Sequence, residues 1–107
     1  MHVHEDDRRL LIEWANGEFK CAKVVTAKVD CVVGDHHHRH KDERFLLLSG
    51  RASVVKIGGE VYTDVKAPQV FDVPRGRYHS FALDAGSVLL GVATAEFDPA
   101  DEVKGEP

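Results

Sequence analysis

Four histidines occupy five consecutive positions in the segment GDHHHRHKDERFLLLSG: His36, His37, His38 and His40, followed by the carboxylate Glu43. Side chains alternate between the two faces of a strand. An extended conformation therefore predicts His36, His38 and His40 on one face and His37 on the other. Imidazoles and a carboxylate that converge from one face are typical ligands of divalent transition metals. The alternative is a solvated, histidine-rich loop that binds metal only adventitiously.

A fourth ligand would have to come from a distant strand, and His79 is the candidate, since the turn PRGR before it re-aims the chain. His36, His38, Glu43 and His79 together would suit Mn, Fe, Ni or Zn and leave open positions for water or substrate. Ligand histidines must be neutral, so we expect metal binding to weaken below about pH 6.

Short strands are the elements that would position these residues, because β-branched residues are frequent, turn signals recur and helical periodicity is weak. The expected strands cover residues 10–14, 19–33 (two strands or one bent strand), 45–48, 51–57, 60–65, 70–73, 78–83 and 87–94. This pattern predicts an all-β fold, an antiparallel jelly-roll β-barrel with room inside for side chains or one small ligand.

The chain has 107 residues, which predicts one domain (1–107), with the barrel over about 9–96 and a polar, loose tail over 97–107. The formal net charge is −4, with both signs interspersed, so no nucleic-acid partner is expected. No apolar run has membrane-spanning length and no signal peptide is evident, so no membrane partner and a cytoplasmic location are expected. Cys21 and Cys31 are expected to be reduced, small apolar residues.

Two spaced motifs resemble those of the cupin family. The first is His-x-His, four residues, Glu, six residues, Gly, and the second is Pro-x-Gly-x-x-His. The matching residues are His36, His38, Glu43, Gly50, Pro74, Gly76 and His79. The resemblance implies the cupin jelly roll and a divalent metal held by His36, His38, Glu43 and His79.

The ligand pair within the histidine cluster has two possible registers. His36 and His38 give the four-residue spacer that is common in cupins. His38 and His40 give a two-residue spacer, similar to that of mannose-6-phosphate isomerase-like cupins. We favour His36 and His38, which would leave His40 near the pocket mouth. The family's usual residues are replaced at Asp30 and Leu83, which puts only loop geometry in doubt.

Within the cupins, the chain looks most like the sugar-nucleotide 3,4-ketoisomerase and 3,5-epimerase group. The segments that carry this resemblance are DDRRLLIE, FKCAKVV, GDHHHR and VLLGVATAEFDPADEV. Those isomerases use no metal; paired histidines move protons next to a carbonyl. This chain departs from them at Val33, where the group has Arg, and at Glu43, where it often has Gln. The glutamate restores the metal-ligand set.

Three functions are consistent with these residues. The first is a metal-dependent isomerase or epimerase of a small oxygenated, carbohydrate-like substrate, in which the metal polarises a carbonyl or hydroxyl and His40 or Tyr78 carries the proton. The second is a non-haem metal dioxygenase. The third is a non-catalytic cupin that binds a small ligand. The fold does not choose among them.

Two further expectations concern partners. Exposed arginines could hold a phosphate or carboxylate of the ligand, and the candidates are Arg51, Arg75 and Arg77. Small cupins tend to be dimers, so we expect a homodimer in which residues 10–14 (LLIEW) form a shared strand. The alternative for this segment is an ordinary edge strand.

Overall fold

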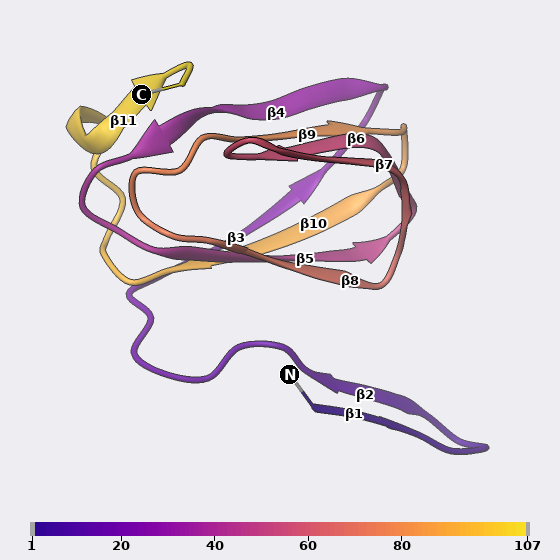
Figure 1. Ribbon diagram of the computed structural model, residues 1–107. Coiled ribbons are helices and arrows are strands. Elements are labelled where there is room, and N and C mark those ends of the chain that lie inside the picture. Colours follow the sequence, from indigo (N-terminus) through magenta and orange to yellow (C-terminus); the bar gives the residue numbers. More distant parts are fainter. Residues whose placement is uncertain (1, 107) are drawn as a thin grey trace.

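The structure is a computed structural model that describes residues 2–106, and it is all-β. The strands are β1 (His2–Glu5), β2 (Leu10–Glu13), β3 (Cys21–Thr26), β4 (Cys31–His38), β5 (Glu43–Ser49), β6 (Arg51–Ile57), β7 (Glu60–Lys66), β8 (Gln69–Val73), β9 (His79–Leu83), β10 (Val88–Ala93) and β11 (Glu102–Lys104). A four-stranded sheet has the order β3–β10–β5–β8, and a five-stranded sheet has the order β11–β4–β9–β6–β7. The two sheets lie face to face (Figure 1).

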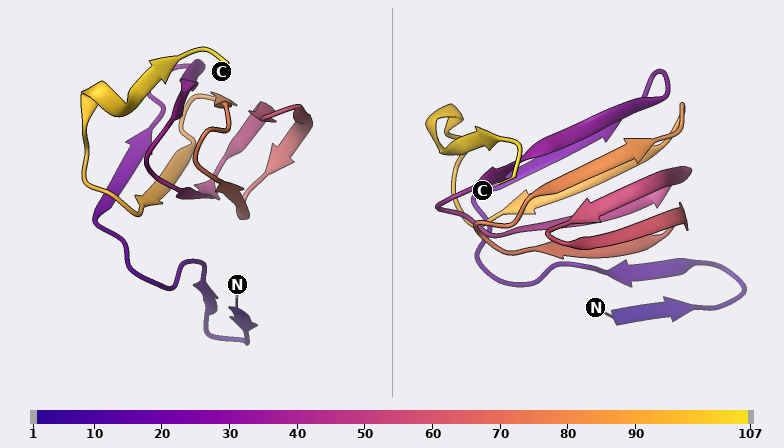
Figure 2. Two further views of the ribbon diagram at one scale, coloured as in Figure 1. Left: turned by 60° about the vertical axis from the view of Figure 1, so that its left-hand side comes forward. Right: turned by 45° about the horizontal axis from the view of Figure 1, so that its top comes forward.

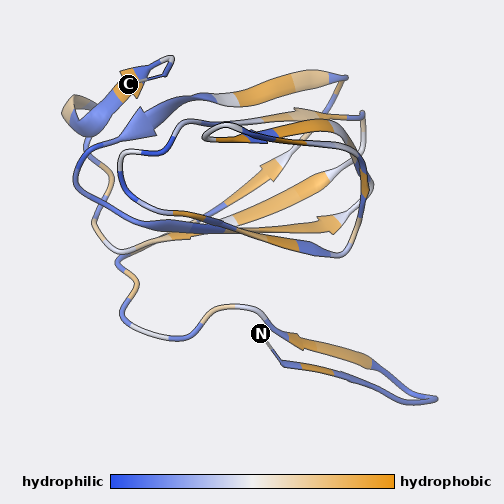
Figure 3. Ribbon diagram, viewed as in Figure 1, coloured by the Kyte–Doolittle hydropathy of each residue, from blue (hydrophilic) through white to orange (hydrophobic). Residues whose placement is uncertain are grey.

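Most strands begin and end close to the predicted positions, and the all-β jelly-roll prediction is confirmed. Residues 19–33 form two strands, β3 and the start of β4. Strand β4 then continues through the histidine cluster as far as His38. It is hydrophobic at its start and hydrophilic at its end, where the candidate ligands lie (Figure 3).

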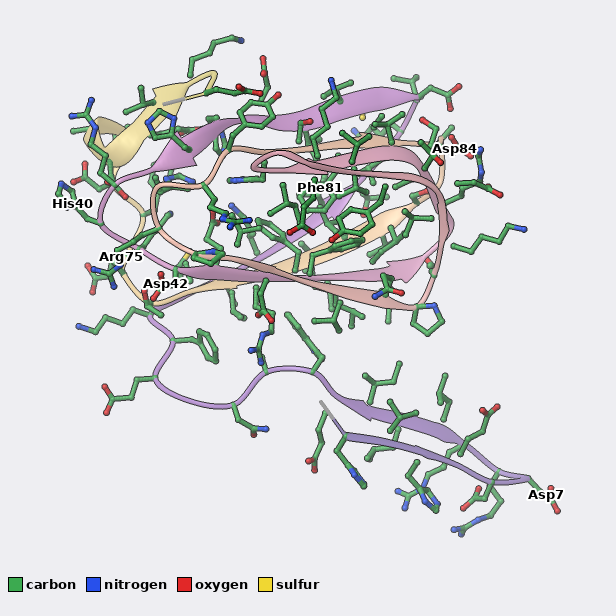
Figure 4. All side chains as sticks on the ribbon, in the orientation of Figure 1. Asp7, His40, Asp42, Arg75, Phe81 and Asp84 are labelled. Carbon is green, nitrogen blue, oxygen red and sulfur yellow. The ribbon has the colours of Figure 1, made fainter. Side chains whose placement is uncertain are left out.

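The hydrophobic core fills the space between the two sheets. On β5, Phe45 and Leu47 point inward, and on the facing β9, Phe81 and Leu83 do so, as strand alternation predicts. Leu46, on the other face of β5, is buried as well. The core cluster consists of Ala27, Phe45, Leu47, Ala52, Val55, Ile57, Phe71, Val73, Phe81, Leu83 and Leu89. Phe81 lies between the layers (Figure 4).

The N-terminal hairpin of β1 and β2 forms a separate two-stranded sheet within the described residues. It lies beside the barrel rather than within it (Figure 2). Strand β2 was predicted, whereas β1 was not, because its four residues are short and mostly polar. Both strands lie largely exposed.

Regular structure continues through residues 99–104, so the prediction of a loose tail over residues 97–107 needs correction there; residue 107 lies outside the described residues. A short 3₁₀ helix, η1 (Pro99–Asp101), is capped by the Asp98 side chain, which accepts from the Ala100 N–H. Strand β11 then pairs with the end of β4, with Glu102 opposite His38 and Lys104 opposite His36. Backbone pairing therefore orders a polar sequence that has little intrinsic strand preference.

Within residues 2–106 no helix is long and apolar enough to span a membrane. Cys21 and Cys31 are both free thiols on separate strands.

Candidate metal centre

Three strands bring four ligand-type side chains to one end of the sandwich. His36 and His38 come from β4, Glu43 begins β5 and His79 begins β9. One ligand atom from each residue lies within 4.8 Å of the others. His38, Glu43 and His79 are buried and His36 is half-buried. These are the four residues that the sequence spacing singled out. That they hold a metal ion stays a prediction.

A β-bulge at Asp35 aligns the histidines. Asp35 has φ of 62°, and the register between β4 and β9 shifts there so that His36 lies opposite His79. Opposed residues of an antiparallel pair share a face, so both imidazoles point inward. Gly34 precedes the bulge with φ of 85°, and a Cβ atom there would lie 2.8 Å from the His79 carbonyl oxygen. Glycine is therefore required for this close approach.

The ligand-type atoms face one another without hydrogen-bond partners. Glu43 Oε1 lies 3.1 Å from His38 Nε2 and 3.6 Å from His79 Nε2. Among the described residues, five buried side-chain atoms lack a hydrogen bond, and all belong to this cluster: His36 Nε2, His38 Nδ1, His38 Nε2, Glu43 Oε1 and His79 Nδ1. Buried polar atoms are normally satisfied, so such a convergent set fits a cation better than an empty core.

Two carboxylates from the C-terminal segment lie behind the histidines. Glu102 Oε1 lies 2.5 Å from His36 Nδ1, and Asp101 Oδ2 lies 3.7 Å from His38 Nδ1. The Glu102 contact engages Nδ1 of His36 and leaves its Nε2 atom unpaired, whereas the Asp101 contact is too long for a hydrogen bond and only places a negative charge behind His38. Carboxylates behind metal-ligating histidines commonly fix the ring orientation and tautomer in this way. Sequence reasoning missed both residues, although the DPAD sequence is a signal for a capped turn.

The environment favours the protonation states that metal binding requires. Burial lowers the pKa of His79 from 6.5 to about 4, and burial also lowers the pKa of His36. Burial alone would raise the pKa of Glu43, but the contact with His38 and the charge of Lys23 lower it from 4.5 to about 2. The imidazoles of His36 and His79 are thus neutral and the Glu43 carboxylate is ionised near neutral pH. Protons would begin to displace a metal from these two histidines at a lower pH than from histidines with an ordinary pKa.

A small cavity of about 100 Å³ adjoins the cluster inside the barrel. Its walls include His36, His79 and an apolar set from both sheets: Val25, Val33, Phe45, Phe81 and Leu89. Lys23 also lines it, and Lys23 Nζ lies 3.3 Å from Glu43 Oε2. Lys23 and Val25 are two residues apart on β3 and so share a face, but nothing in the sequence assigned Lys23 to the site.

His40 lies outside the cluster, so the prediction that it shares the inward face with His36 and His38 is wrong. Strand β4 ends at His38, and a bend follows at Arg39 and His40, which breaks the alternation. His40 is exposed at the edge of the molecule (Figure 4), and its backbone N–H donates to Asp101 Oδ1. The alternative pair of His38 and His40 therefore has no geometric support.

The two other histidine-adjacent residues have structural contacts. His37 points away from the cluster, as the alternation predicted, and its Nδ1 donates to the Gly105 carbonyl at 2.8 Å. The Tyr78 hydroxyl donates to Asp35 Oδ1 at 2.7 Å, which supports the bulge. Tyr78 does not line the cavity beside the cluster, so neither His40 nor Tyr78 lies where a proton carrier is needed.

The arginines considered as anion ligands are engaged by carboxylates at the surface. Arg51 contacts Asp64 and Asp84, and Arg75 contacts Asp42 (Figure 4). Arg77 lies 3.8 Å from Glu60. No arginine among the described residues lines the 100 Å³ cavity, whereas Val33 does.

Several solved structures share this fold. A 3,4-ketoisomerase from Helicobacter canadensis is 18% identical over 96% of this chain and 85% of that chain, with a TM-score of 0.79. QdtA, a sugar 3,4-ketoisomerase from Thermoanaerobacterium thermosaccharolyticum in complex with TDP, is 22% identical over 97% and 83%, with a TM-score of 0.77. The capsular polysaccharide assembling protein CapF from Staphylococcus aureus is 24% identical over 99% of this chain, with a TM-score of 0.69.

The chain spans 32% of the length of CapF, and most of the length of the two ketoisomerases. No protein-family model matches the sequence, and no curated protein matches it. The likeness therefore establishes the fold. The chain has the jelly-roll fold that its two motifs predicted, and its fold neighbours include sugar 3,4-ketoisomerases and a 3'-monoepimerase.

Proposed function

We propose that the protein is a metal-binding cupin enzyme that isomerises or epimerises a small oxygenated, carbohydrate-like substrate. The observation that carries this proposal is the set of four buried or half-buried ligand-type side chains within 4.8 Å, with orphaned atoms facing one another. The sugar isomerases and epimerases among its fold neighbours support the reaction class. Glu43 and Val33 are the two positions at which the sequence departs from the pattern of the isomerase group that it resembles.

His36, His38, Glu43 and His79 would hold a divalent ion such as Mn, Fe, Ni or Zn. When bound, such an ion would supply Lewis-acid polarisation of a carbonyl or hydroxyl oxygen. The chain itself contributes the apolar walls of the cavity, which exclude water from the reacting atoms. Lys23 provides a positive charge at the edge of that cavity. No proton carrier is assigned, since His40 and Tyr78 lie elsewhere.

Elemental analysis of native protein, purified without a histidine tag or a nickel column, tests this proposal. We expect about one equivalent of a transition metal per chain, lost on incubation with a chelator. The His38→Ala variant, purified in parallel, should carry none and serves as the control for surface-bound metal. Native protein that contains no more metal than this variant would contradict the proposal.

A metal-free sugar-nucleotide isomerase is the second candidate. It is favoured by the fold neighbours, one of which is described in complex with TDP-4-keto-6-deoxyglucose. In this alternative His36 and His79, whose ring centroids are 4.5 Å apart, would move protons next to a carbonyl. Chelator-treated protein that catalyses solvent hydrogen exchange into such a keto sugar, followed by proton NMR, would favour it over the metal-dependent proposal.

The proposal includes a cytoplasmic homodimer. The outer face of the four-stranded sheet exposes apolar side chains, with Val24 at 67% and Leu48 at 46% relative exposure. A cavity of about 380 Å³ separates this face from the N-terminal hairpin, where Leu10 is 49% exposed. A second copy of the chain that covers this surface would bury these residues, which isolated soluble domains rarely expose together.

A further inference from the structure

Lys23 is an unusual residue for the position it occupies. It lies on β3, whose neighbours Cys21 and Val25 point into the barrel, and its own side chain also enters the barrel. Its stem passes the ring of Phe45, with Nζ 5.5 Å from the ring centroid, and ends beside Glu43 on β5. The lysine ammonium points at a cluster of candidate metal ligands, so its positive charge would lie close to that of a bound metal ion. Two like charges close together do not stabilise the fold, so the position of Lys23 calls for another explanation.

Gly91 makes this path possible. It lies on β10 directly between Lys23 on β3 and Phe45 on β5, opposite both. A Cβ atom at Gly91 would lie 3.2 Å from Lys23 Cε and 2.9 Å from Phe45 Cε1. Because glycine has no side chain, the lysine stem passes over β10 and reaches β5, the strand on the other side of β10.

The two oxygens of Glu43 are used differently. Oε1 faces His38 and His79, whereas Oε2 faces Lys23 Nζ at 3.3 Å. An ammonium group carries three donors, and Glu43 Oε2 is the only side-chain hydrogen-bond acceptor of Lys23 within residues 2–106. Two donors therefore remain for another acceptor, and the side chain is 42% exposed at the cavity wall.

We infer that Lys23 binds a carboxylate of the substrate, so that the enzyme acts on a small organic acid, such as a hydroxy or keto acid, held beside the metal centre. This rests on the proposed function and narrows its substrate. A divalent ion and the Lys23 ammonium together would exceed the single negative charge of Glu43, which favours an anionic group on the substrate. The planar fork of an arginine, which suits phosphate, is absent from the described residues that line the cavity. A volume of about 100 Å³ corresponds to roughly three water molecules, so only a small acid fits.

The experiment is a calorimetric titration of apo and zinc-loaded protein with glycolate and with glycolamide, its neutral counterpart of nearly equal size. We expect zinc-loaded protein to bind glycolate at least about tenfold more tightly than glycolamide, because a hydrogen bond to a charged group contributes more than a neutral one. Gluconate, a larger acid, should bind more weakly than glycolate.

The Lys23→Met variant should lose the preference for glycolate while binding zinc as tightly as the native protein or more tightly, since a competing positive charge is removed. Lys28→Met, an exposed lysine just beyond the same strand, is the matched control and should behave as native. Lys23→Gln serves if the methionine variant does not fold. A Lys23 variant that still prefers glycolate overturns the inference, as does one that loses zinc and glycolate together, because Lys23 would then only position Glu43.

Failure of the proposed function gives a different result. A native protein that binds no zinc contradicts the metal-dependent proposal. The titration of apo protein then decides the role of Lys23 alone: glycolate binding that Lys23→Met abolishes supports it, and binding that is absent or unchanged overturns it.

Discussion

The four candidate ligands differ in how much each depends on its surroundings. His79 is 1% exposed and opposes His36 across the strand pair. Among the described residues, His79 is the one histidine that β9 contributes to the cluster. We expect His79→Ala and His38→Ala each to weaken zinc binding by more than about 100-fold. This is more than the loss expected on removing a carboxylate that only contacts a ligand histidine, such as Glu102. Isothermal titration calorimetry measures this.

His40→Ala is the matched control for these ligand variants, because His40 belongs to the same cluster in the sequence yet lies exposed. It should bind zinc with native affinity. A large loss in His40→Ala together with native affinity in His36→Ala would reverse the choice of ligand pair.

The stability of the metal-free protein should depend on pH through His79. Its pKa is about 4 in the folded protein against 6.5 for the unfolded chain, so the folded state binds fewer protons between these values. The free energy of unfolding should therefore be highest above pH 6.5 and fall by about 3 kcal/mol as the pH drops to 4. Urea unfolding at several pH values measures the change.

The His79→Gln variant should show a flatter pH profile over the same window, because glutamine has no proton to gain. Glu43, whose pKa is lowered from 4.5 to about 2, should add a further loss of stability in both proteins only below pH 4.5. Identical slopes for the two proteins between pH 6.5 and 4 would assign the pH dependence to other groups.

Two elements, η1 and β11, connect the C-terminal segment to the site. We expect Glu102→Gln and Asp101→Asn each to lower zinc affinity by about 10- to 100-fold, the usual effect of removing an outer carboxylate. Competition with a chromophoric chelator measures the affinity. Both substitutions keep side-chain size, and the side-chain amide in the Asp101→Asn variant would retain an oxygen for the Arg39 and His40 N–H groups.

Glu96→Gln is the matched control, since Glu96 is a carboxylate of the same C-terminal region that lies outside η1 and β11. It should leave zinc affinity unchanged. If Glu102→Gln also left affinity unchanged while its folding was native, the contact between Glu102 and His36 would be a surface ion pair without influence on the site.

These elements also show where sequence reasoning ended. The spacing from His36 to Glu43 is local, and Pro74-x-Gly76-x-x-His79 is a recognisable turn, so the four ligand-type residues could be predicted. Lys23, Asp101 and Glu102 could not, because their positions depend on sheet register between strands far apart in the chain. His40 was misplaced for a local reason: alternation holds only within a strand, and β4 ends two residues earlier.

For the molecule as a whole, the fold class could be predicted because strand length, turn residues and motif spacing all agree. The two terminal additions, β1 and β11, could not, because both are short and polar and gain their strand form from pairing. The N-terminal hairpin forms a sheet separate from the barrel. It is therefore available to pair with a second copy of the chain, as the homodimer prediction requires.

We expect the protein to elute as a dimer and to give twice its chain mass of 11.9 kDa by light scattering at micromolar concentration. Val24→Glu, on the outer face of the four-stranded sheet, should shift it toward monomer, because a buried charge there would lack a partner. Val32→Glu is the matched control, with similar exposure (63% against 67%) on the five-stranded sheet. A monomeric native protein would contradict the prediction.

The pairing of β11 with β4 has a consequence for biosynthesis. A nascent chain emerges from its N-terminus, so His36, His38, Glu43 and His79 leave the ribosome before Asp101 and Glu102 do. His36, His38 and Glu43 would thus be the first of these residues exposed to cellular metal ions, before the carboxylates behind the histidines emerge. The last strand to fold would then close over imidazoles that already hold an ion, and the choice of metal would reflect which ion is abundant at that moment as well as the geometry of the finished site.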